Sequence, residues 1–592
     1  MFHRQKTFDI QDEFREVSEG QKGIDHRPFL TWDWNDRLDT AEVRRQVRCF
    51  AEANFRGFII TPAAGLLSHP LDTEWMDALE AAVDEAQRQN LKICLQERMH
   101  LPAPTLSNSN QQQAHGLYGS ILKAEVLAAG PDSNPPPPAH NTIAFYSARQ
   151  VNGKLVHIHR LGGELAAGAD TPGAQSPLDS TGPLPPLSVP DDSHPGEEPL
   201  ASPEPHEEGT LTSDAEHDTP AESPEIPDPT LAAPSLPDSP AMPQKESGNS
   251  VPDEPGDKVL LHLYAESTGL LDPLSMESVR SFMDGAPENY FREFGAEFGK
   301  TITGLVVDVP GFSSPPWSGA LPASFEEMFG KDLLNILPCV LLDAEGTSED
   351  RLQYWNAVSS LFARACTGQI EAWCSNREIR FWARFEGSGS LAGQMARNGG
   401  VMPQYNAASG FLLPYSEGRA DMALAFKQAA SSVHQGEDKR LMAELSHVSD
   451  HSEPFAPTLA AAVSAVAFGA NDLCTSRVPF SLRGSRKVQP HSFSHPQQPS
   501  WPLQRRINQF LTRLHFLLDM GESATSLAIL HPLRSAWKVY PESLQALDEL
   551  LQSVTDDANS NSCDFDFLDE TLLQSKATIQ QAKLRMGCSL YR

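Results

Sequence analysis

The feature that most constrains the fold of this chain is a regular alternation of short apolar runs and amphipathic helices. Near the N-terminus, three apolar runs (29–34, 58–61 and 91–95) are separated by segments with helical periodicity. One of these helices starts at Asp72 or Thr73 and repeats apolar side chains at i, i+3 and i+4. Strands separated by helices of this length usually form parallel βαβ units. This part of the chain therefore predicts parallel strands covered by helices.

The same rhythm returns in the second half of the chain. Its candidate strands are residues 258–264, 302–309, 378–385, 400–405, 440–445 and 471–474. Together with the three N-terminal strands they make nine candidates, about the eight that a closed barrel requires. We therefore predict an α/β fold, a (β/α)8 TIM-type barrel. A later strand (526–532) and a helix (541–554) predict a partial C-terminal α/β segment.

A long interruption separates the two halves of the predicted barrel. Residues 142–161 predict a β-hairpin that turns at Asn152 and Gly153, within a small β insertion. Residues 165–257 contain 20 acidic residues, 20 prolines and a single basic residue, Lys245. This composition buries too little apolar surface to offset the entropy of ordering, so the segment is predicted to be disordered. The predicted parts are the first part of the barrel (1–105), the β insertion (106–164), the disordered acidic Pro-rich linker (165–257), the remainder of the barrel (258–520) and the partial C-terminal α/β segment (521–592).

Composition argues against several classes of function. The formal charge of −32 at pH 7 disfavours nucleic-acid binding, which needs clustered lysine and arginine. The eight cysteines include no CxxC pair, which favours buried free thiols over disulfides or zinc. The N-terminus lacks the apolar core of a signal peptide, and no apolar run reaches the ~20 residues of a membrane span. We therefore expect a cytoplasmic protein without a membrane segment.

The stretch TGLVVDVP at residues 303–310 predicts a carboxylate at the end of a buried strand. Its apolar run delivers Asp308 to the strand end, and Pro310 closes the turn. A barrel presents catalytic residues at this end of its strands. Val309 occupies the position where a second acid would complete a paired-carboxylate site. The sequence leaves open whether the missing acid means that catalysis is lost.

Several blocks of the sequence resemble one family of enzymes. Residues 32–97, from WDWNDRLDT to KICLQE, resemble the large glycoside hydrolases related to the α-L-rhamnosidases of family 106. The segments VVDVP, SSVHQGEDKRLMAELSHV, FSLRGSRK and PQQPSW look like later blocks of the same family, in the same order. The resemblance covers roughly residues 28–105 and 258–535. It implies a (β/α)8 barrel with a β insertion that acts on glycans.

The positions that carry the chemistry depart from the family's pattern. Val309 stands where the family has an acid, and Arg384 stands where it has a histidine. A Pro-His pair near a late strand end is replaced by Thr475 and Ser476. The positions that fit the pattern are Trp34, Asn35, Gly65, Leu66, Trp75, Glu97, Asp308, Pro310, Trp373, Glu444, Ser481, Arg483, Gly484 and Lys487.

Three acids remain as catalytic candidates. Glycoside hydrolysis generally needs two carboxyl groups about 5 to 9.5 Å apart across the scissile bond. Glu444 follows the predicted strand RLMA and is the best candidate, with Asp308 or Glu97 as its partner. Family members use calcium in some cases, and oxygen ligands from these acids make such an ion conceivable, but Ca²⁺ wants six to eight oxygens. We predict no metal ligands and no cofactor.

Substrate-binding candidates come from the aromatic residues and from the resemblance. Trp34 and Trp317 present rings on which the apolar face of a sugar can stack, although core packing explains them equally well. The resemblance adds Asn35, Arg384 and Arg483. The GSGS stretch at residues 387–390 opens a helix and is a weak candidate for an anion cradle.

Two hypotheses of function follow, and both name a carbohydrate or a glycosylated small molecule as the partner. The first is a glycoside hydrolase-like enzyme with a reduced set of catalytic residues, which hydrolyses a small glycoside. The second is a non-catalytic barrel that acts as a binding or accessory protein, for example in specialised metabolism. Convergence of Glu444, Asp308 and Glu97 on one pocket would favour the first. The oligomeric state is left open.

Overall fold

In the computed structural model, Met1–Leu165 and Pro255–Arg592 belong to the same unit. Its described residues are 14, 16–17, 24–99, 117–128, 135, 137–139, 141–161, 257–312, 315–344, 347–415, 420–445, 455–484, 486, 495–521, 523–580, 583–586 and 589–591. The predicted disordered linker (165–257) lies outside these residues except for Asp257, which begins a strand.

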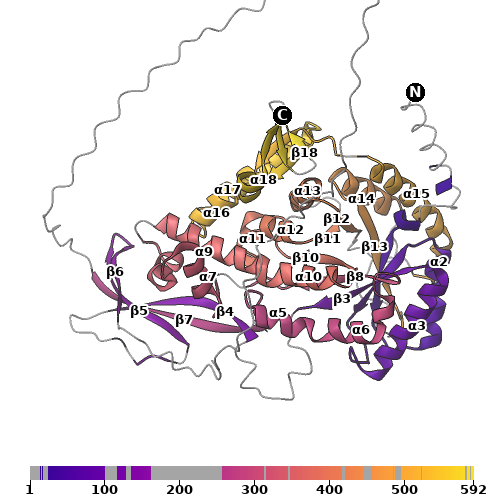
Figure 1. Cartoon of the computed structure of the whole chain (residues 1–592), viewed down its shortest axis with the longest axis horizontal. Coiled ribbons are helices and arrows are strands. Elements are labelled where there is room, and N and C mark those ends of the chain that lie inside the picture. Colours follow the sequence, from indigo (N-terminus) through magenta and orange to yellow (C-terminus); the bar gives the residue numbers. More distant parts are fainter. Residues whose placement is uncertain are drawn as a thin grey trace, which may run out of the picture. The chain divides into compact units, whose positions relative to one another are not determined.

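Eight parallel strands form a closed barrel, which confirms the predicted fold class (Figure 1). Around the barrel the strands follow the order β1, β13, β12, β11, β10, β8, β3, β2. Their bounds are β1 (Phe29–Trp34), β2 (Gly57–Pro62), β3 (Lys92–Arg98), β8 (Ile302–Val309), β10 (Arg380–Phe385), β11 (Gly410–Tyr415), β12 (Arg440–Leu445) and β13 (Asp472–Pro479).

Helices cover the outside of the barrel because their apolar stripes pack on the strands. The first two begin at side-chain caps, where Asp39 and Asp72 accept hydrogen bonds from backbone N–H groups of the first helical turn. The helices of the barrel unit are α2 (Thr40–Glu52), α3 (Thr73–Gln89), α5 (Met276–Met283), α6 (Ala286–Phe294), α7 (Leu321–Phe329), α8 (Leu337–Leu341), α9 (Thr347–Phe362), α10 (Gln369–Ser375), α11 (Leu391–Arg397), α12 (Val401–Ala407), α13 (Ala420–Gln435), α14 (Phe455–Ala467) and α15 (Trp501–Asp519).

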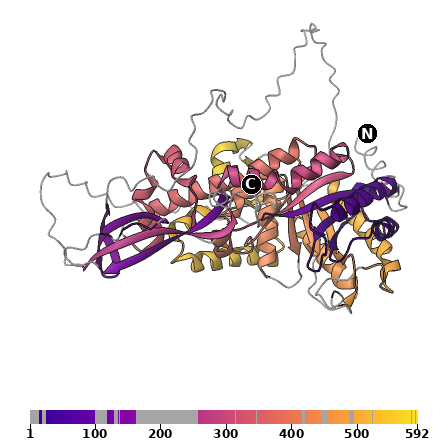
Figure 2. The same cartoon turned by 90° about the horizontal axis from the view of Figure 1, so that it is seen from below.

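A five-stranded antiparallel sheet adjoins the barrel, with four strands from the stretch between β3 and β8 and a fifth from just after β8 (Figure 2). It contains β4 (Tyr118–Ala128), β5 (Thr142–Val151), β6 (Lys154–Leu161), β7 (Asp257–Leu271) and β9 (Pro316–Trp317). The predicted hairpin is confirmed, since β5 and β6 pair around Asn152 and Gly153, both with positive φ. The segment KVLLHLY, predicted as part of the second half of the barrel, lies in β7 of this sheet instead. An apolar run shows that a strand is buried but does not identify the sheet that it joins.

One predicted barrel strand is wrong and one real strand was missed. Residues 401–405 lie in helix α12 and not in a strand, with Gly400 as its N-cap, and Pro403 within that run already argues against a central strand. The strand at this place in the barrel is β11, whose sequence GFLLPY contains Pro414. A proline has no N–H for the strand ladder, which weakens the sequence signal of a central strand.

The C-terminal segment is an α/β unit, as predicted. Its strands β14 (Leu527–Leu530) and β15 (Phe565–Leu568) pair in parallel, and a three-stranded antiparallel sheet follows. The other elements are α16 (Leu533–Val539), α17 (Leu544–Ser560), α18 (Glu570–Lys576), β16 (Thr578–Gln580), β17 (Lys583–Met586) and β18 (Ser589–Tyr591). Among the residues that the structure describes, no helix is both long and apolar enough to cross a membrane.

Candidate functional site

The inside of the barrel consists of an apolar layer below a polar layer. Alternate residues of a strand point to the same side, so each strand contributes one residue to each layer. The apolar layer is made of Phe29, Ile59, Cys94, Val306, Trp382, Leu412, Met442 and Cys474, one from each strand. The next inward position lies two residues further along in seven strands and three residues further along in β13, where the register shifts. These positions are Thr31, Thr61, Gln96, Asp308, Arg384, Pro414, Glu444 and Arg477. This polar layer lies at the carboxyl ends of the strands, where TIM barrels carry active sites.

Three carboxylates and three guanidinium groups alternate around this end of the barrel, and we call them the mouth chain. In order, the members of the mouth chain are Asp33, Arg477, Glu444, Arg384, Asp308 and Arg98. The N–O distances are 3.6 Å from Arg477 to Asp33 and 3.7 Å from Arg477 to Glu444. Arg384 also pairs with Glu444, and lies 3.6 Å from Asp308. The formal charges of the mouth chain therefore cancel.

Glu444 is buried in the centre of the mouth chain, with its side chain 2% exposed. Its Oε1 accepts a hydrogen bond of 2.9 Å from the hydroxyl of Thr31. Burial alone would raise the pKa of this carboxyl, but Arg384 and Arg477 outweigh burial and lower the pKa below its ordinary value. Glu444 is therefore ionised at neutral pH and has no proton to give to a leaving group.

Asp308 is the second acid of the mouth chain. Gln96 donates hydrogen bonds of 3.0 Å to both of its carboxylate oxygens. Arg98 lies 3.4 Å away on one side, and Arg384 lies on the other. The amide oxygen of Gln96 in turn accepts a hydrogen bond of 2.6 Å from Thr61. This network fixes the Asp308 carboxylate as an acceptor.

Glu97 is not brought together with the other two acids. It follows Gln96 on β3, so it points to the outside of the barrel while Gln96 points to the inside. There it accepts a hydrogen bond of 2.9 Å from Tyr290 on α6. Burial raises the pKa of Glu97 to about 7, against the lowering effect of the tyrosine hydrogen bond. The structure therefore brings together Glu444 and Asp308 but not Glu97.

The predicted substrate-binding residues lie in five different places. Trp34 is buried on the outer face of β1, and its ring packs 4.8 Å from that of Trp75. Asn35 exchanges two hydrogen bonds with the backbone of Ser481 and so joins the loops that follow β1 and β13. Trp317 lies in β9 of the five-stranded sheet, and Arg483 lines a groove outside the mouth. Among these residues, Arg384 alone lies in the mouth chain.

Three members of the mouth chain were missed by the sequence analysis. Asp33 is two residues beyond Thr31 in FLTWDW, so strand alternation alone would have placed it on the inner face. Burial raises the pKa of Asp33 to about 6, even though Arg477 lies beside it. Arg98 and Arg477 carried no signal of their own. Arg477 reaches the inner face because of the register shift beside Thr31, which a sequence pattern does not reveal.

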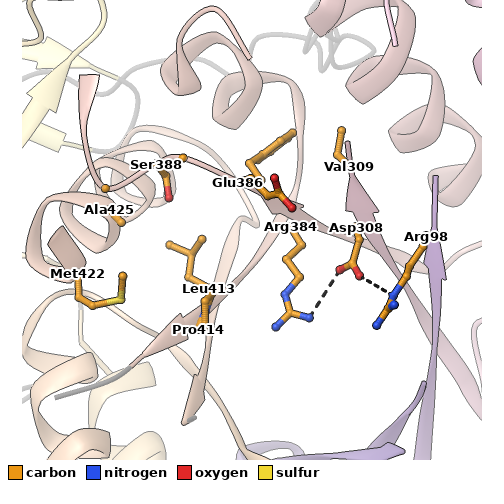
Figure 3. Close-up of a pocket in the computed structure, with 13 residues that line it drawn as sticks. Arg98, Asp308, Val309, Arg384, Glu386, Ser388, Leu413, Pro414, Met422 and Ala425 are labelled. Atoms are coloured by element: carbon orange, nitrogen blue, oxygen red, sulfur yellow. Dashed lines mark ion pairs between the residues drawn. The ribbon is translucent and has the colours of Figure 1, made fainter. Parts of the chain in front are cut away.

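A cavity of about 600 Å³ opens beside the mouth chain (Figure 3). Its two sides differ in chemistry. Arg98, Asp308, Arg384 and Glu386 line one side, and the apolar side is formed by Leu413, Pro414, Met422 and Ala425. The cavity lies between the ends of β10 and β11, which share one paired position, Ala383 with Phe411. The ladder thus ends before Pro414, and the strands are open where the cavity lies.

The residues at the mouth do not fit a calcium ion. Asp308 and Glu444 already have guanidinium partners, and Glu97 is on the opposite face of the barrel wall. Across the part of the chain that the structure describes, no group of three or more His, Cys, Asp or Glu side chains is arranged to hold a metal ion. A Ca²⁺ ion needs six to eight oxygen ligands, which this site does not offer.

Two solved structures with a similar fold are glycoside hydrolases. The rhamnosidase from Novosphingobium sp. PP1Y superposes with a TM-score of 0.62 at 12% identity, covering 98% of this chain and 66% of its own. The chain has a glycoside hydrolase-like fold. The β-galactosidase from the psychrophilic Marinomonas ef1 gives a TM-score of 0.50 at 9% identity, covering 92% of this chain and 70% of its own. This chain thus spans slightly less than two thirds of the length of the rhamnosidase. No protein-family model matches the sequence, and no curated protein does.

Proposed function

We propose that this glycoside hydrolase-like barrel binds a small glycoside in the mouth cavity without hydrolysing it. The observation that carries the proposal is the mouth chain. A glycosidase needs one carboxyl that is still protonated near neutral pH, and a second carboxylate that acts as nucleophile or base. Glu444 has a lowered pKa and is paired with Arg384, while Asp308 lies between Arg384 and Arg98. Glu444 therefore has no proton to donate, and both acids are engaged by arginines. Asp33, the mouth-chain acid whose pKa is raised to about 6, is fully buried and is not among the residues that line the cavity.

The two sides of the cavity support a glycoside as the ligand. Arg98 has a half-exposed side chain (52%), and its described partner is the Asp308 carboxylate, which its Nε faces. Its terminal N–H groups can therefore donate to sugar hydroxyls, while Glu386 offers acceptor oxygens. Leu413 and Met422 offer an apolar surface to an aglycone. A volume of about 600 Å³ is within the usual range for small-molecule sites.

One observation favours hydrolysis as a second candidate function. Arg384 alone spans the gap between Asp308 and Glu444, so the two carboxyl groups flank a single guanidinium. Glycosidases separate their two carboxyl groups by about 5 to 9.5 Å. A substrate that displaced Arg384 would therefore meet a pair of acids across its glycosidic bond. This candidate requires Arg384 to move when the ligand binds.

The experiment that separates the two functions measures binding and turnover on the same preparation. Aryl glycosides, α-L-rhamnoside included, are titrated into the protein by calorimetry and then incubated with it, with and without calcium. We expect saturable binding and no turnover. Arg98→Gln should lose about tenfold in affinity, which corresponds to about 1.4 kcal/mol of binding free energy. Turnover that disappears in Glu444→Gln would instead establish the hydrolase. A folded protein that binds none of the glycosides would overturn the proposed function.

A further inference from the structure

One side of the mouth cavity is held in place by contacts with the C-terminal segment (residues 521–592). Residues 386–390, which we call the wall loop, follow β10 and line the cavity through Glu386 and Ser388. The wall loop makes a tight turn at Gly387, whose φ is +79°. A Cβ atom there would lie 2.5 Å from the carbonyl oxygen of Gly393, so no other residue fits without a backbone shift. The wall loop therefore packs closely on α11, and its position depends on what holds that helix.

The first contact links His531 of the C-terminal segment to the wall loop by way of Gln428 on α13. Its amide nitrogen donates to the backbone carbonyls of Ser388 and Leu424, at 2.8 and 3.0 Å. Two carbonyl acceptors on one side fix the orientation of the amide, so its oxygen faces Gln394 and His531. His531 Nε2 lies 2.9 Å from this oxygen, and an amide oxygen only accepts. The buried His531 must therefore carry its proton on Nε2 and donate it to Gln428.

The second contact is made by Asp548 on α17. Its carboxylate accepts hydrogen bonds from the backbone N–H groups of Leu391 and Ala392, at 2.8 and 3.4 Å. These N–H groups begin α11, directly after the wall loop. The GSGS stretch was a candidate for an anion cradle, and the anion that the helix start receives is the carboxylate of Asp548. A charged acceptor makes such hydrogen bonds stronger than neutral ones.

We propose that His531 and Asp548 are positioning residues for the ligand, which set the wall loop from the C-terminal segment without touching the cavity. This inference rests on the proposed function only for the identity of the ligand. The C-terminal segment then belongs to the binding site, because it holds one side of the cavity in place. A ligand that contacts Ser388 and Glu386 depends on His531 through Gln428.

The test compares variants that remove or keep the donor of His531. His531→Leu removes the hydrogen bond to Gln428, whereas His531→Gln places an amide N–H near the position of Nε2. Asp548→Ala removes the second contact. The matched control is Tyr591→Phe, which deletes a buried hydroxyl that bonds to Asp566 and Gln435 in the same segment, away from the wall loop. All five proteins are compared by amide hydrogen exchange at residues 386–392 and by affinity for an aryl glycoside.

We expect exchange at residues 386–392 to rise about tenfold or more in His531→Leu and Asp548→Ala, and to stay within about twofold in His531→Gln and Tyr591→Phe; a tenfold change corresponds to about 1.4 kcal/mol. Affinity for the glycoside should fall in the same two variants. Unchanged exchange in both variants would overturn the inference, and so would an equal rise in Tyr591→Phe. Because exchange needs no ligand, a wild-type protein that binds no glycoside contradicts the proposed function while the exchange result still decides the role of His531 and Asp548.

Discussion

Glu444 and Glu97 are two glutamates at strand ends of one barrel, and their surroundings move their pKa values in opposite directions. Glu444 points inward and meets two arginines, which lower its pKa despite complete burial. Glu97 points outward against Tyr290, and burial raises its pKa to about 7. Of these two glutamates, the one with the pKa of a general acid thus lies outside the mouth, and the one inside is ionised at neutral pH; Asp33, the mouth-chain acid with a raised pKa, is fully buried. The charges of the arginines outweigh burial at Glu444, whereas burial has the larger effect on the pKa of Glu97.

The difference arises from strand alternation and from the arginines that the neighbouring strands supply. On β3 the inward residue is Gln96, an amide that donates to Asp308. Its neighbour Glu97 therefore faces the helices. A barrel can in this way retain a carboxylate at the centre of its mouth without giving it the protonation state of a general acid. This contrast is the physical basis of the proposal that the barrel binds and does not hydrolyse.

The largest expected effect comes from removing the central arginine. Arg384→Met leaves the buried carboxylate of Glu444 with Arg477 as its remaining cation, and breaking a buried pair costs about 3 to 5 kcal/mol. In the wild type the lowered pKa of Glu444 contributes stability above its ordinary value of 4.5, and this contribution is lost as pH falls through the folded pKa. The destabilisation should therefore be largest at neutral pH and shrink in acid. Urea unfolding at several pH values measures it.

A double-mutant cycle serves as the control for Arg384→Met. Glu444→Gln removes the charge and keeps the shape of the side chain, so Arg384→Met should cost much less in that background. Equal costs in both backgrounds would mean that the arginine stabilises the barrel without acting through Glu444, and the comparison would fail.

A smaller change in stability is expected at Glu97, where the substitution should stabilise the protein. Its folded pKa of about 7 exceeds the ordinary 4.5, so the favourable protonated state is fully present below about pH 4.5 and is lost as pH rises through 7. Glu97→Gln keeps the acceptor for Tyr290 and cannot ionise. The variant should be more stable than the wild type by about 1 to 3 kcal/mol at high pH, and equal to it in acid. Thermal unfolding at two pH values tests this, and a gain that does not depend on pH contradicts it.

The smallest effect on stability is expected at Arg98. Its ion pair with Asp308 is half exposed, and pairs of this kind contribute about 0 to 1 kcal/mol. Arg98→Gln should therefore unfold at nearly the same urea concentration as the wild type while losing affinity for glycosides. If Arg98→Gln lost as much stability as Arg384→Met, the mouth chain would be one cooperative unit, and Arg98 would not serve binding separately from stability.

Much of the fold could be predicted from the sequence, because apolar runs and helical periodicity are local signals. The errors in the strand prediction have local causes too. Pro414 weakened the strand signal of β11, and an apolar run in α12 was predicted as a strand although it is helical. The five-stranded sheet was only partly predicted because β7 reads like a barrel strand, and its partners lie far away in the chain.

The candidate site was less predictable, since it depends on which face of each strand is turned inward. Asp308 and Glu444 were named because acids at strand ends face the mouth in many barrels. Their arginine partners come from other strands, and no motif connects Arg98 or Arg477 to them. Trp34 was named for sugar stacking, but alternation within β1 puts it on the outer face beside Trp32.

The most direct test of the account is the protonation state of Glu444 in the folded protein. Infrared difference spectra of wild type and Glu444→Gln, with glutamate labelled by carbon-13, report this carboxyl as pH is varied between about 4 and 8, a range that spans ordinary and raised glutamate pKa values. The account predicts a carboxylate across this range, with protonation only below the ordinary pKa of 4.5. A protonated carboxyl at neutral pH would contradict it, because Glu444 would then have the state of a general acid and the barrel would be equipped for hydrolysis.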